Sequence, residues 1–321
     1  MSVVANSKKR TILKYFNINF QCNNRCRYCF SYNTEKRTAY AITLDDFVMA
    51  SSIMDSVFNY RFVLNGGEPT IHTDFLEIIK CCSNLKECVL FTNGRMLTEF
   101  SQEVIHQIVT SLSQITIPIH GSQQIHDWIT QVPGSFSQTI SGLKRLKEYS
   151  TPSCNVEVKF IVNPYMIKEG FNIHDFLINN GFTEESITVV LAGQVHTRVA
   201  KGNGIPSPLD YEQITGEYLS SQLTTLLGKY RIKIMDIPLC ALTPEVQNRI
   251  LQYGDHADDV LYEYWYYDGK HPRGHLVSSY DDERTEERCR FCQHLRICRS
   301  ITRTCRVLVL DLDKRKSVVF E

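Results

Sequence analysis

The sequence predicts an α/β fold, a partial (β/α)6 barrel of the TIM type followed by a smaller C-terminal domain. Two observations support this fold class. Six short apolar runs rich in β-branched residues alternate with segments whose apolar residues recur every three or four positions. The conspicuous polar motifs each follow one of these runs. Parallel strands joined by helices carry their functional groups at the carboxyl ends of the strands, so both observations indicate the same architecture.

The six expected strands cover residues 13–20, 61–65, 88–93, 115–120, 156–163 and 187–192. Five helices are expected at residues 43–58, 74–82, 97–112, 135–149 and 172–181. Thr43 followed by acidic residues is typical of a helix start, and Gly181 is typical of a helix end. Together these elements predict a barrel domain over residues 1–192.

The pattern changes after residue 192. Residues 193–239 predict a connecting loop, a helix at 211–230 and a strand that leads to Cys240. Residues 240–321 are expected to form a separate auxiliary domain. It contains a final hairpin at 305–321 and an aromatic and charged run at 260–275. We expect that run to be a half-buried hairpin, and the alternative is a peptide-binding edge or an aromatic substrate wall.

The composition argues against several classes of function. Lys+Arg and Asp+Glu are both 35, so the net charge of zero gives no reason to expect nucleic acid or an anionic membrane as a partner. No apolar run is long enough for a transmembrane helix, and the first residues do not resemble a signal peptide. We therefore expect a cytoplasmic protein, in which metal binding or catalysis explains the high count of 12 cysteines better than disulfides do.

Three cysteines follow the first expected strand, with the spacing C-x3-C-x2-C: Cys22, Cys26 and Cys29. A structural zinc site or an ordinary iron–sulfur cluster uses four protein ligands, so this loop has one too few. Three thiolates can hold three irons of a [4Fe–4S] cluster and leave the fourth iron open to a substrate or cofactor. The alternative is a zinc site with a remote fourth ligand, although zinc ligands usually come as C-x2–4-C pairs.

With the motifs that follow the next strands, this loop resembles that of the radical S-adenosylmethionine (SAM) superfamily. Tyr28 stands at the aromatic position before the last cysteine, and Gly66-Gly67-Glu68-Pro69 resembles the SAM-binding turn after the second strand. Further landmarks are "TNG" at 92–94 and "HD", six residues and "GSF" at 126–136. The resemblance covers residues 13–192.

The resemblance implies an open-iron [4Fe–4S] cluster on the three cysteines, with SAM chelating the open iron. An external one-electron reductant of the flavodoxin or ferredoxin type would supply the electron that cleaves SAM. The 5′-deoxyadenosyl radical so formed would abstract a substrate hydrogen. Glu68 would contact the methionyl ammonium or fix the turn, whose glycines would let the backbone approach SAM. The positions implied to bind SAM are Gly66, Gly67, Glu68, Pro69, Tyr28 and Asn93.

The fourth expected strand departs from the family pattern. Pro118 and His120 stand where relatives often have Ser and Asp, and Thr130 stands where an Arg often follows the "HD" pair. His120 is either a cofactor contact or a strand-end histidine satisfied by backbone. Candidates that could replace the lost contacts are Ser122, Lys159 and Asn163.

A second group of cysteines, Cys289, Cys292 and Cys298, resembles part of the SPASM extension or its shorter version, twitch. Cys240 would be the upstream ligand. The tail has too few cysteines for the two clusters of a full SPASM domain, so the resemblance implies one auxiliary [4Fe–4S] cluster. Cys305 would replace one ligand or stay free, and a zinc knuckle is the alternative. The cysteines expected to pack as small hydrophobic residues are Cys81, Cys82, Cys88 and Cys154.

The resemblance favours an enzyme that modifies a ribosomally synthesised peptide (a RiPP maturase) by crosslinking, thioether formation or epimerisation. One alternative is a small-molecule radical SAM dehydrogenase or another biosynthetic enzyme. A non-enzyme alternative is an inactive iron–sulfur or zinc binding module. The intact cysteine triplet and "GGEP" argue against that loss of activity.

Overall fold

The computed structural model describes the greater part of the 321-residue chain. Its described residues are 11–29, 41–56, 58–183, 186–193, 212–235, 237, 242–253, 260–267, 272–281, 304–311 and 316–319. Within these ranges, no helix combines the length and the apolar character needed to cross a membrane.

One sheet runs through the molecule, with the strand order β11-β10-β9-β8-β1-β2-β3-β4-β5-β6-β7. From β1 to β7 each strand is parallel to the next one along the chain, which confirms the predicted α/β architecture. The strand expected before Cys240 joins the sheet as its seventh parallel strand, β7. These strands are β1 (Thr11–Asn19), β2 (Asn59–Gly66), β3 (Cys88–Phe91), β4 (Gln114–Ile119), β5 (Asn155–Val162), β6 (Thr188–Gly193) and β7 (Arg231–Met235).

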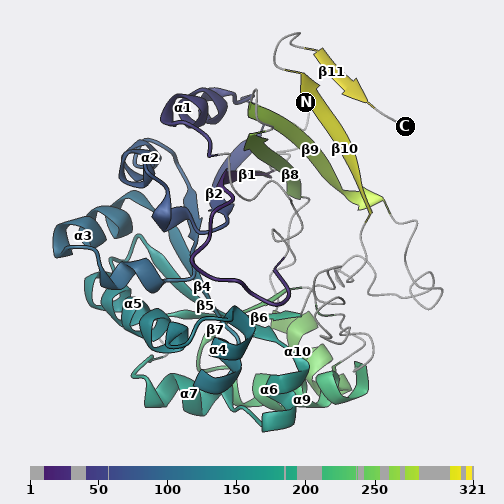
Figure 1. Ribbon diagram of the computed structural model, residues 1–321. Helices are drawn as coiled ribbons and strands as arrows, with labels where there is room; N and C mark the ends of the chain where they lie inside the picture. Colours follow the sequence, from purple (N-terminus) through teal and green to yellow (C-terminus); the bar gives the residue numbers. More distant parts are fainter. Residues whose placement is uncertain are drawn as a thin grey trace, which may run out of the picture.

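Helices lie along the outer side of the curved sheet, so that it forms an open barrel (Figure 1). They are α1 (Leu44–Ser52), α2 (Phe75–Cys82), α3 (Gln102–Ser111), α4 (Gln123–Thr130), α5 (Ser135–Tyr149), α6 (Pro164–Glu169), α7 (Ile173–Asn179), α9 (Glu212–Leu226) and α10 (Pro244–Tyr253). The core between the two layers is apolar. Strand residues such as Phe16 and Leu64 pack in one buried cluster with helix residues such as Ile78 and Leu143. Their burial is the main stabilising contribution to the barrel.

Two expected helices have different bounds. The capping box at Thr43 confirms the predicted start of α1, but the helix ends at Ser52 instead of continuing to residue 58. The buried ammonium of Lys14 donates to the carbonyl oxygens of Ala50 and Ile53, which satisfies the end of α1 there. The helix expected at 97–112 is divided into a 3-10 turn at Arg95–Thr98 and α3, which starts at Ser101 as its cap.

The C-terminal strands extend the same sheet. β8 (Val260–Tyr267) and β9 (Pro272–Asp281) form the hairpin expected near 260–275, and β10 (Thr304–Asp311) pairs with β11 (Lys316–Val319) as the final hairpin. β8 also pairs with β1 in parallel. The domain boundaries at 192 and 240 remain predictions.

The expected ligands of the auxiliary cluster, Cys240, Cys289, Cys292 and Cys298, lie outside the described residues. The backbone of Cys305 belongs to β10, while its side chain lies outside the description.

Candidate functional site

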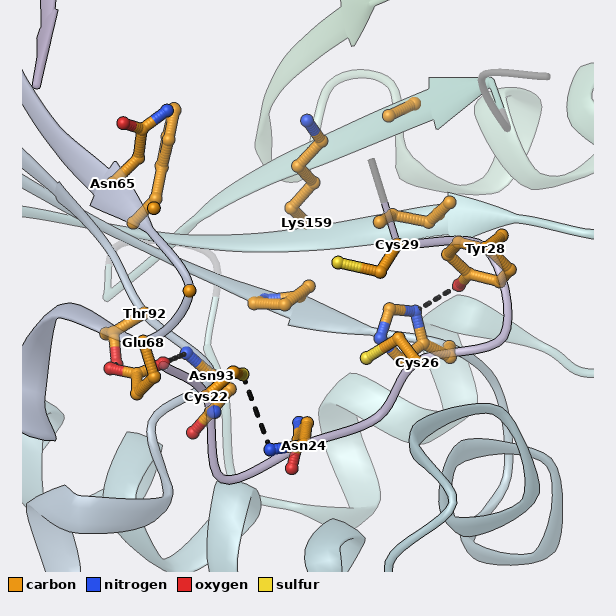
Figure 2. Close-up of a pocket in the computed structure, with 17 residues that line it drawn as sticks. Cys22, Asn24, Cys26, Tyr28, Cys29, Asn65, Glu68, Thr92, Asn93 and Lys159 are labelled. Carbon is orange, nitrogen blue, oxygen red and sulfur yellow. Dashed lines mark hydrogen bonds between the residues drawn. The ribbon is translucent and has the colours of Figure 1, made fainter. Parts of the chain in front are cut away.

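A cavity of about 320 Å³ lies between the segment at residues 20–29, called the cysteine loop below, and the carboxyl ends of β2 to β6. Cys22, Cys26 and Cys29 all line it, and none of the three forms a disulfide (Figure 2). The motifs that follow separate strands thus meet at one mouth, as the sequence predicts for parallel strands.

The glycine turn, Gly66–Pro69, is bonded directly to the start of the cysteine loop. The amide of Gly67 donates to the carbonyl of Asn19 at 2.8 Å, and the amide of Glu68 donates to that of Gln21 at 2.7 Å. A Cβ on Gly67 would collide with the Gln21 carbonyl, and Gly66 has a φ of +131°, which disfavours side chains. The glycines therefore let two backbones touch. This role is additional to the expected approach to SAM.

The carboxylate of Glu68 is buried and fully engaged by the protein. One oxygen accepts hydrogen bonds from the amide of Thr70 (3.1 Å), its hydroxyl (2.6 Å) and the hydroxyl of Thr92 (2.6 Å). The other oxygen accepts from the amide of Asn93 at 2.7 Å. Burial raises the pKa of Glu68, and these four donors oppose that rise. This geometry supports the second expected role, fixing the turn and tying it to the loop after β3.

The loop after β3 also fastens the cysteine loop. The Asn93 side-chain amide donates to the Asn23 side-chain carbonyl at 2.6 Å. Arg95 donates to the side-chain oxygen of Asn24 at 2.7 Å and to the backbone carbonyl of Asn23. These three residues, Asn23, Asn24 and Arg95, were not predicted from the sequence. The available signal was their position, inside the loop or immediately after "TNG".

Three rings connect the cysteine loop to β4 and α4. The hydroxyl of Tyr28 lies 2.5 Å from Nδ1 of His120, and the ring of His126 is centred 5.0 Å from that of His120. Burial, with a smaller contribution from His126, holds the pKa of His120 well below its usual value, so its ring is neutral. With the Tyr28 hydroxyl as donor, His120 carries its proton on Nε2.

His120 lines the cavity, and its Nε2 has no hydrogen-bond partner within the described part of the chain. One of the two roles expected for His120 was a histidine at a strand end whose ring is hydrogen-bonded to the backbone. The ring is hydrogen-bonded to the hydroxyl of Tyr28 instead. Its backbone carbonyl accepts a hydrogen bond from Asn163 at 2.9 Å.

The "HD…GSF" motif fixes the end of α4 that holds the cysteine loop. Asp127 accepts hydrogen bonds from the amides of Gly134 and Phe136, both at 2.7 Å, at the start of α5. The carbonyls of Ile129 and Thr130 at the end of α4 then accept from the amides of Arg27 and Arg25, both at 2.9 Å. Thr130 contributes through its backbone, and its hydroxyl is 2.6 Å from that of Ser135.

The remaining candidates divide into cavity and supporting positions. Lys159 lines the cavity, and Figure 2 shows its side chain extending away from the cysteine loop. Ser122, Asn163 and Pro69 lie outside the lining. Ser122 caps α4 and donates to Glu169 at 2.8 Å, Asn163 caps α6, and Pro69 begins a short 3-10 turn. Strand-end residues that line the cavity and were not identified from the sequence are Asn65, Phe91, Ile161 and Ala192.

The donor set fits a [4Fe–4S] cluster. Three cysteine thiols border one cavity, and the amide of Asn24 donates to the Cys22 sulfur at 3.4 Å, a kind of bond that tunes cluster thiolates. Among the described residues, no three His, Cys, Asp or Glu side chains are placed to share a single metal ion. In a cubane each thiolate binds its own iron, so the ligands do not need to converge on one point.

Comparison with known proteins gives a family match over the first half of the chain. The model of the Radical SAM superfamily matches residues 16–177. An AdoMet-dependent heme synthase of Methanosarcina barkeri is 26% identical over 200 residues, which are 60% of this chain and 53% of that protein. A probable GTP 3′,8-cyclase of Saccharolobus islandicus is 25% identical over 166 residues, 51% of this chain and 52% of that protein. The match thus spans about half the length of these curated relatives.

Two solved structures share the fold over most of the chain. Streptococcus suis SuiB bound to the precursor peptide SuiA has a TM-score of 0.61 at 14% identity, covering 91% of this chain and 71% of that one. Native anSMEcpe with bound AdoMet and the Cp18Cys peptide has a TM-score of 0.58 at 15% identity, covering 90% and 88%. At these identities the likeness establishes the fold.

The contact at Gly67 leads to a first prediction. Gly67→Ala places a methyl group against the Gln21 carbonyl and should displace the cysteine loop, so that most of the cluster iron is lost after anaerobic reconstitution. Iron and sulfide assays measure this. Gly170→Ala is the control for backbone strain alone, because its φ of +65° also disfavours a side chain while a Cβ there meets nothing within 4 Å. Equal iron contents in the two variants would contradict the proposed contact.

The burial of His126 leads to a second prediction. Burial lowers the pKa of His126 from 6.5 to about 4. As the pH falls below 6.5, the unfolded chain binds a proton that the folded chain refuses until about pH 4, so stability is lost across that window. This histidine should therefore remove about 2 kcal/mol of unfolding free energy between pH 7.5 and 5.

Urea denaturation of the cluster-free protein at the two pH values tests this effect. His126→Leu should reduce the acid sensitivity by about that amount, about 2 kcal/mol. His106→Leu, at an exposed histidine of α3, should keep the wild-type acid sensitivity. An unchanged pH dependence in His126→Leu would show that His126 is not the group responsible.

Proposed function

The chain belongs to the radical SAM superfamily of enzymes, and from this premise we propose that it cleaves SAM reductively and abstracts a hydrogen atom from a ribosomally synthesised peptide. One observation carries the proposal: three cysteine thiols border one cavity whose opposite rim is the glycine turn, hydrogen-bonded to the loop that bears them. A loop fixed in this way holds its cysteines in place before any cofactor binds, which lowers the cost of binding.

Different residues around the cavity would bind SAM and the cluster. Cys22, Cys26 and Cys29 hold the cluster, which when bound supplies the electron for cleavage of the C5′–S bond of SAM. The glycine turn presents backbone groups to the methionyl end of SAM. His120 offers its Nε2 proton and Lys159 its positive charge to the polar groups of SAM. Positions that line the cavity or brace its walls are Gly66, Gly67, Glu68, Pro69, Tyr28, Asn93, Ser122 and Asn163.

The peptide substrate is supported by the fold. The SuiB and anSMEcpe structures are both described with a bound peptide, and each resembles about nine-tenths of this chain. The curated relatives carry the names of a heme synthase and a GTP cyclase, and both names denote enzymes of small molecules. A small-molecule substrate is therefore the second candidate.

The proposal includes an auxiliary [4Fe–4S] cluster in the C-terminal part of the chain. Its ligands would be Cys240, Cys289, Cys292 and Cys298, and Cys305 would replace one of them or stay free. Two clusters would give about eight irons per chain with matching sulfide. A single cluster on the cysteine loop would give about four. Zinc without sulfide in the tail would contradict the auxiliary cluster and leave the first site untouched.

The proposed function predicts the following outcome. Anaerobically reconstituted wild type, given dithionite and SAM, should form 5′-deoxyadenosine. A triple variant should form none, because the cluster has lost its ligands; it combines Cys22→Ala, Cys26→Ala and Cys29→Ala. The triple variant should keep about four irons if the auxiliary cluster exists. Liquid chromatography and iron assays provide both readouts. Undiminished cleavage by the triple variant would overturn the proposal, as would an intact wild-type cluster that never cleaves SAM.

The same reaction can distinguish the substrate classes. With a deuterated peptide pool, wild type should transfer deuterium into 5′-deoxyadenosine, because the abstracted hydrogen comes from the substrate. Transfer from a deuterated pool of small metabolites, without transfer from peptides, would favour the second candidate.

A further inference from the structure

The cysteine loop has a second face that the cofactor site does not use. Along the loop, Asn24, Cys26 and Tyr28 line the cavity, whereas the intervening Arg25 and Arg27 do not. The Arg25 side chain is exposed, and its guanidinium has no hydrogen bond or ion pair with any described residue. The two arginines flank Cys26, so they are separated from the expected cluster by the thickness of one loop.

Arg27 belongs to a rigid aromatic platform. Its guanidinium carbon lies 4.1 Å from the centre of the Trp128 ring, and its Nε donates to the Trp128 carbonyl at 2.9 Å. Trp128 packs in turn on Tyr165, with 4.6 Å between ring centres, and keeps 37% of its surface exposed. Cation–π stacking holds the charge in place at low entropic cost, and exposed Trp and Arg are typical of protein interfaces.

The cysteine loop carries charge of one sign only. The sequence contains no Asp or Glu from residue 17 to residue 34, although the whole chain has a net charge of zero. Two acids lie on the neighbouring helices and keep their negative charge, but both carboxylates are bonded to groups outside the cysteine loop. Asp127 is engaged by the start of α5, and Glu169 accepts a hydrogen bond from Ser122. A basic and aromatic face therefore lies directly behind the cysteines.

We propose that Arg25, Arg27 and Trp128 form the docking face for a small acidic one-electron carrier protein that reduces the cluster. This inference rests on the proposed function, which needs an electron from outside. SAM and the substrate occupy the cavity side of the loop, so the carrier must approach from the other side. Complementary charge on a protein surface accelerates diffusional encounter and orients the partner.

The test measures how fast a flavodoxin hydroquinone of acidic surface charge reduces the reconstituted cluster, by stopped-flow absorbance at low ionic strength. Arg25→Glu should lower the bimolecular rate constant about ten-fold, because the steering charge is reversed. Lys86→Glu is the matched control. It makes the same charge change at an exposed lysine just before β3, at the opposite end of the strands, and should leave the rate constant unchanged.

Salt and a second reductant complete the test. The difference between wild type and Arg25→Glu should shrink as salt screens the charges. Dithionite, a small reductant that needs no docking face, should reduce both proteins at similar rates. If Arg25→Glu fails to hold a cluster, Arg25→Gln should show the same trend at roughly three-fold, since it removes one charge instead of reversing it.

Two results would overturn the docking face. One is an equal, equally salt-dependent rate constant for wild type, the Arg25 variant and Lys86→Glu. The other is a wild-type cluster that dithionite reduces and flavodoxin does not. Cluster reduction without SAM cleavage would instead contradict the proposed function and leave the docking result readable.

Discussion

The contact between the glycine turn and the start of the cysteine loop is the constraint on which the whole site depends. Two backbone hydrogen bonds, from Gly67 to Asn19 and from Glu68 to Gln21, join segments that follow different strands. Each bond contributes about 1 kcal/mol on its own. Their effect is larger than that sum suggests, because the two backbones lie too close for any Cβ on Gly67. The position of Cys22 is thereby fixed by the position of β2.

The other fastenings of the cysteine loop come from separate parts of the barrel. The carboxylate of Glu68 accepts a hydrogen bond from Asn93, which connects the glycine turn to the loop after β3. That loop is hydrogen-bonded to Asn23, and the end of α4 is hydrogen-bonded to the amide of Arg25. Three elements that meet only in the folded chain therefore set the shape of one short loop. The site is therefore organised before cofactor binding. The cysteines face the cavity, and Arg25 and Arg27 lie on the other side of the loop.

Much of this arrangement was predictable from the sequence, because its causes are local. Runs of β-branched residues gave the strands, and parallel strands bring their carboxyl ends together, so the motifs had to converge. The glycines were expected to let the backbone approach SAM, which stays a prediction, and in the structure they let two backbone segments approach each other. That their partner includes the backbone of Gln21 depends on tertiary placement and left no local signal.

The features that were not predicted from the sequence also depend on tertiary placement. Arg95 reaches across to Asn24, and no periodic pattern reveals a bond between two loops. The early end of α1 reflects a buried lysine on β1, Lys14, that takes the helix carbonyls. The helices α4 and α6 were not predicted, and α6 has only six residues, too few for apolar periodicity to identify. The parallel pairing of β8 with β1 joins distant segments, which a single sequence does not encode locally.

The central claim is that the cysteine loop holds three irons and leaves the fourth to SAM. Electron–nuclear double resonance on the reduced wild-type protein tests it most directly, with SAM labelled by 15N in the methionyl amino group and 17O in the carboxylate. The account predicts hyperfine coupling of both labels to the cluster, because both groups chelate the open iron. An intact, reduced cluster that shows neither coupling while SAM is bound would contradict it.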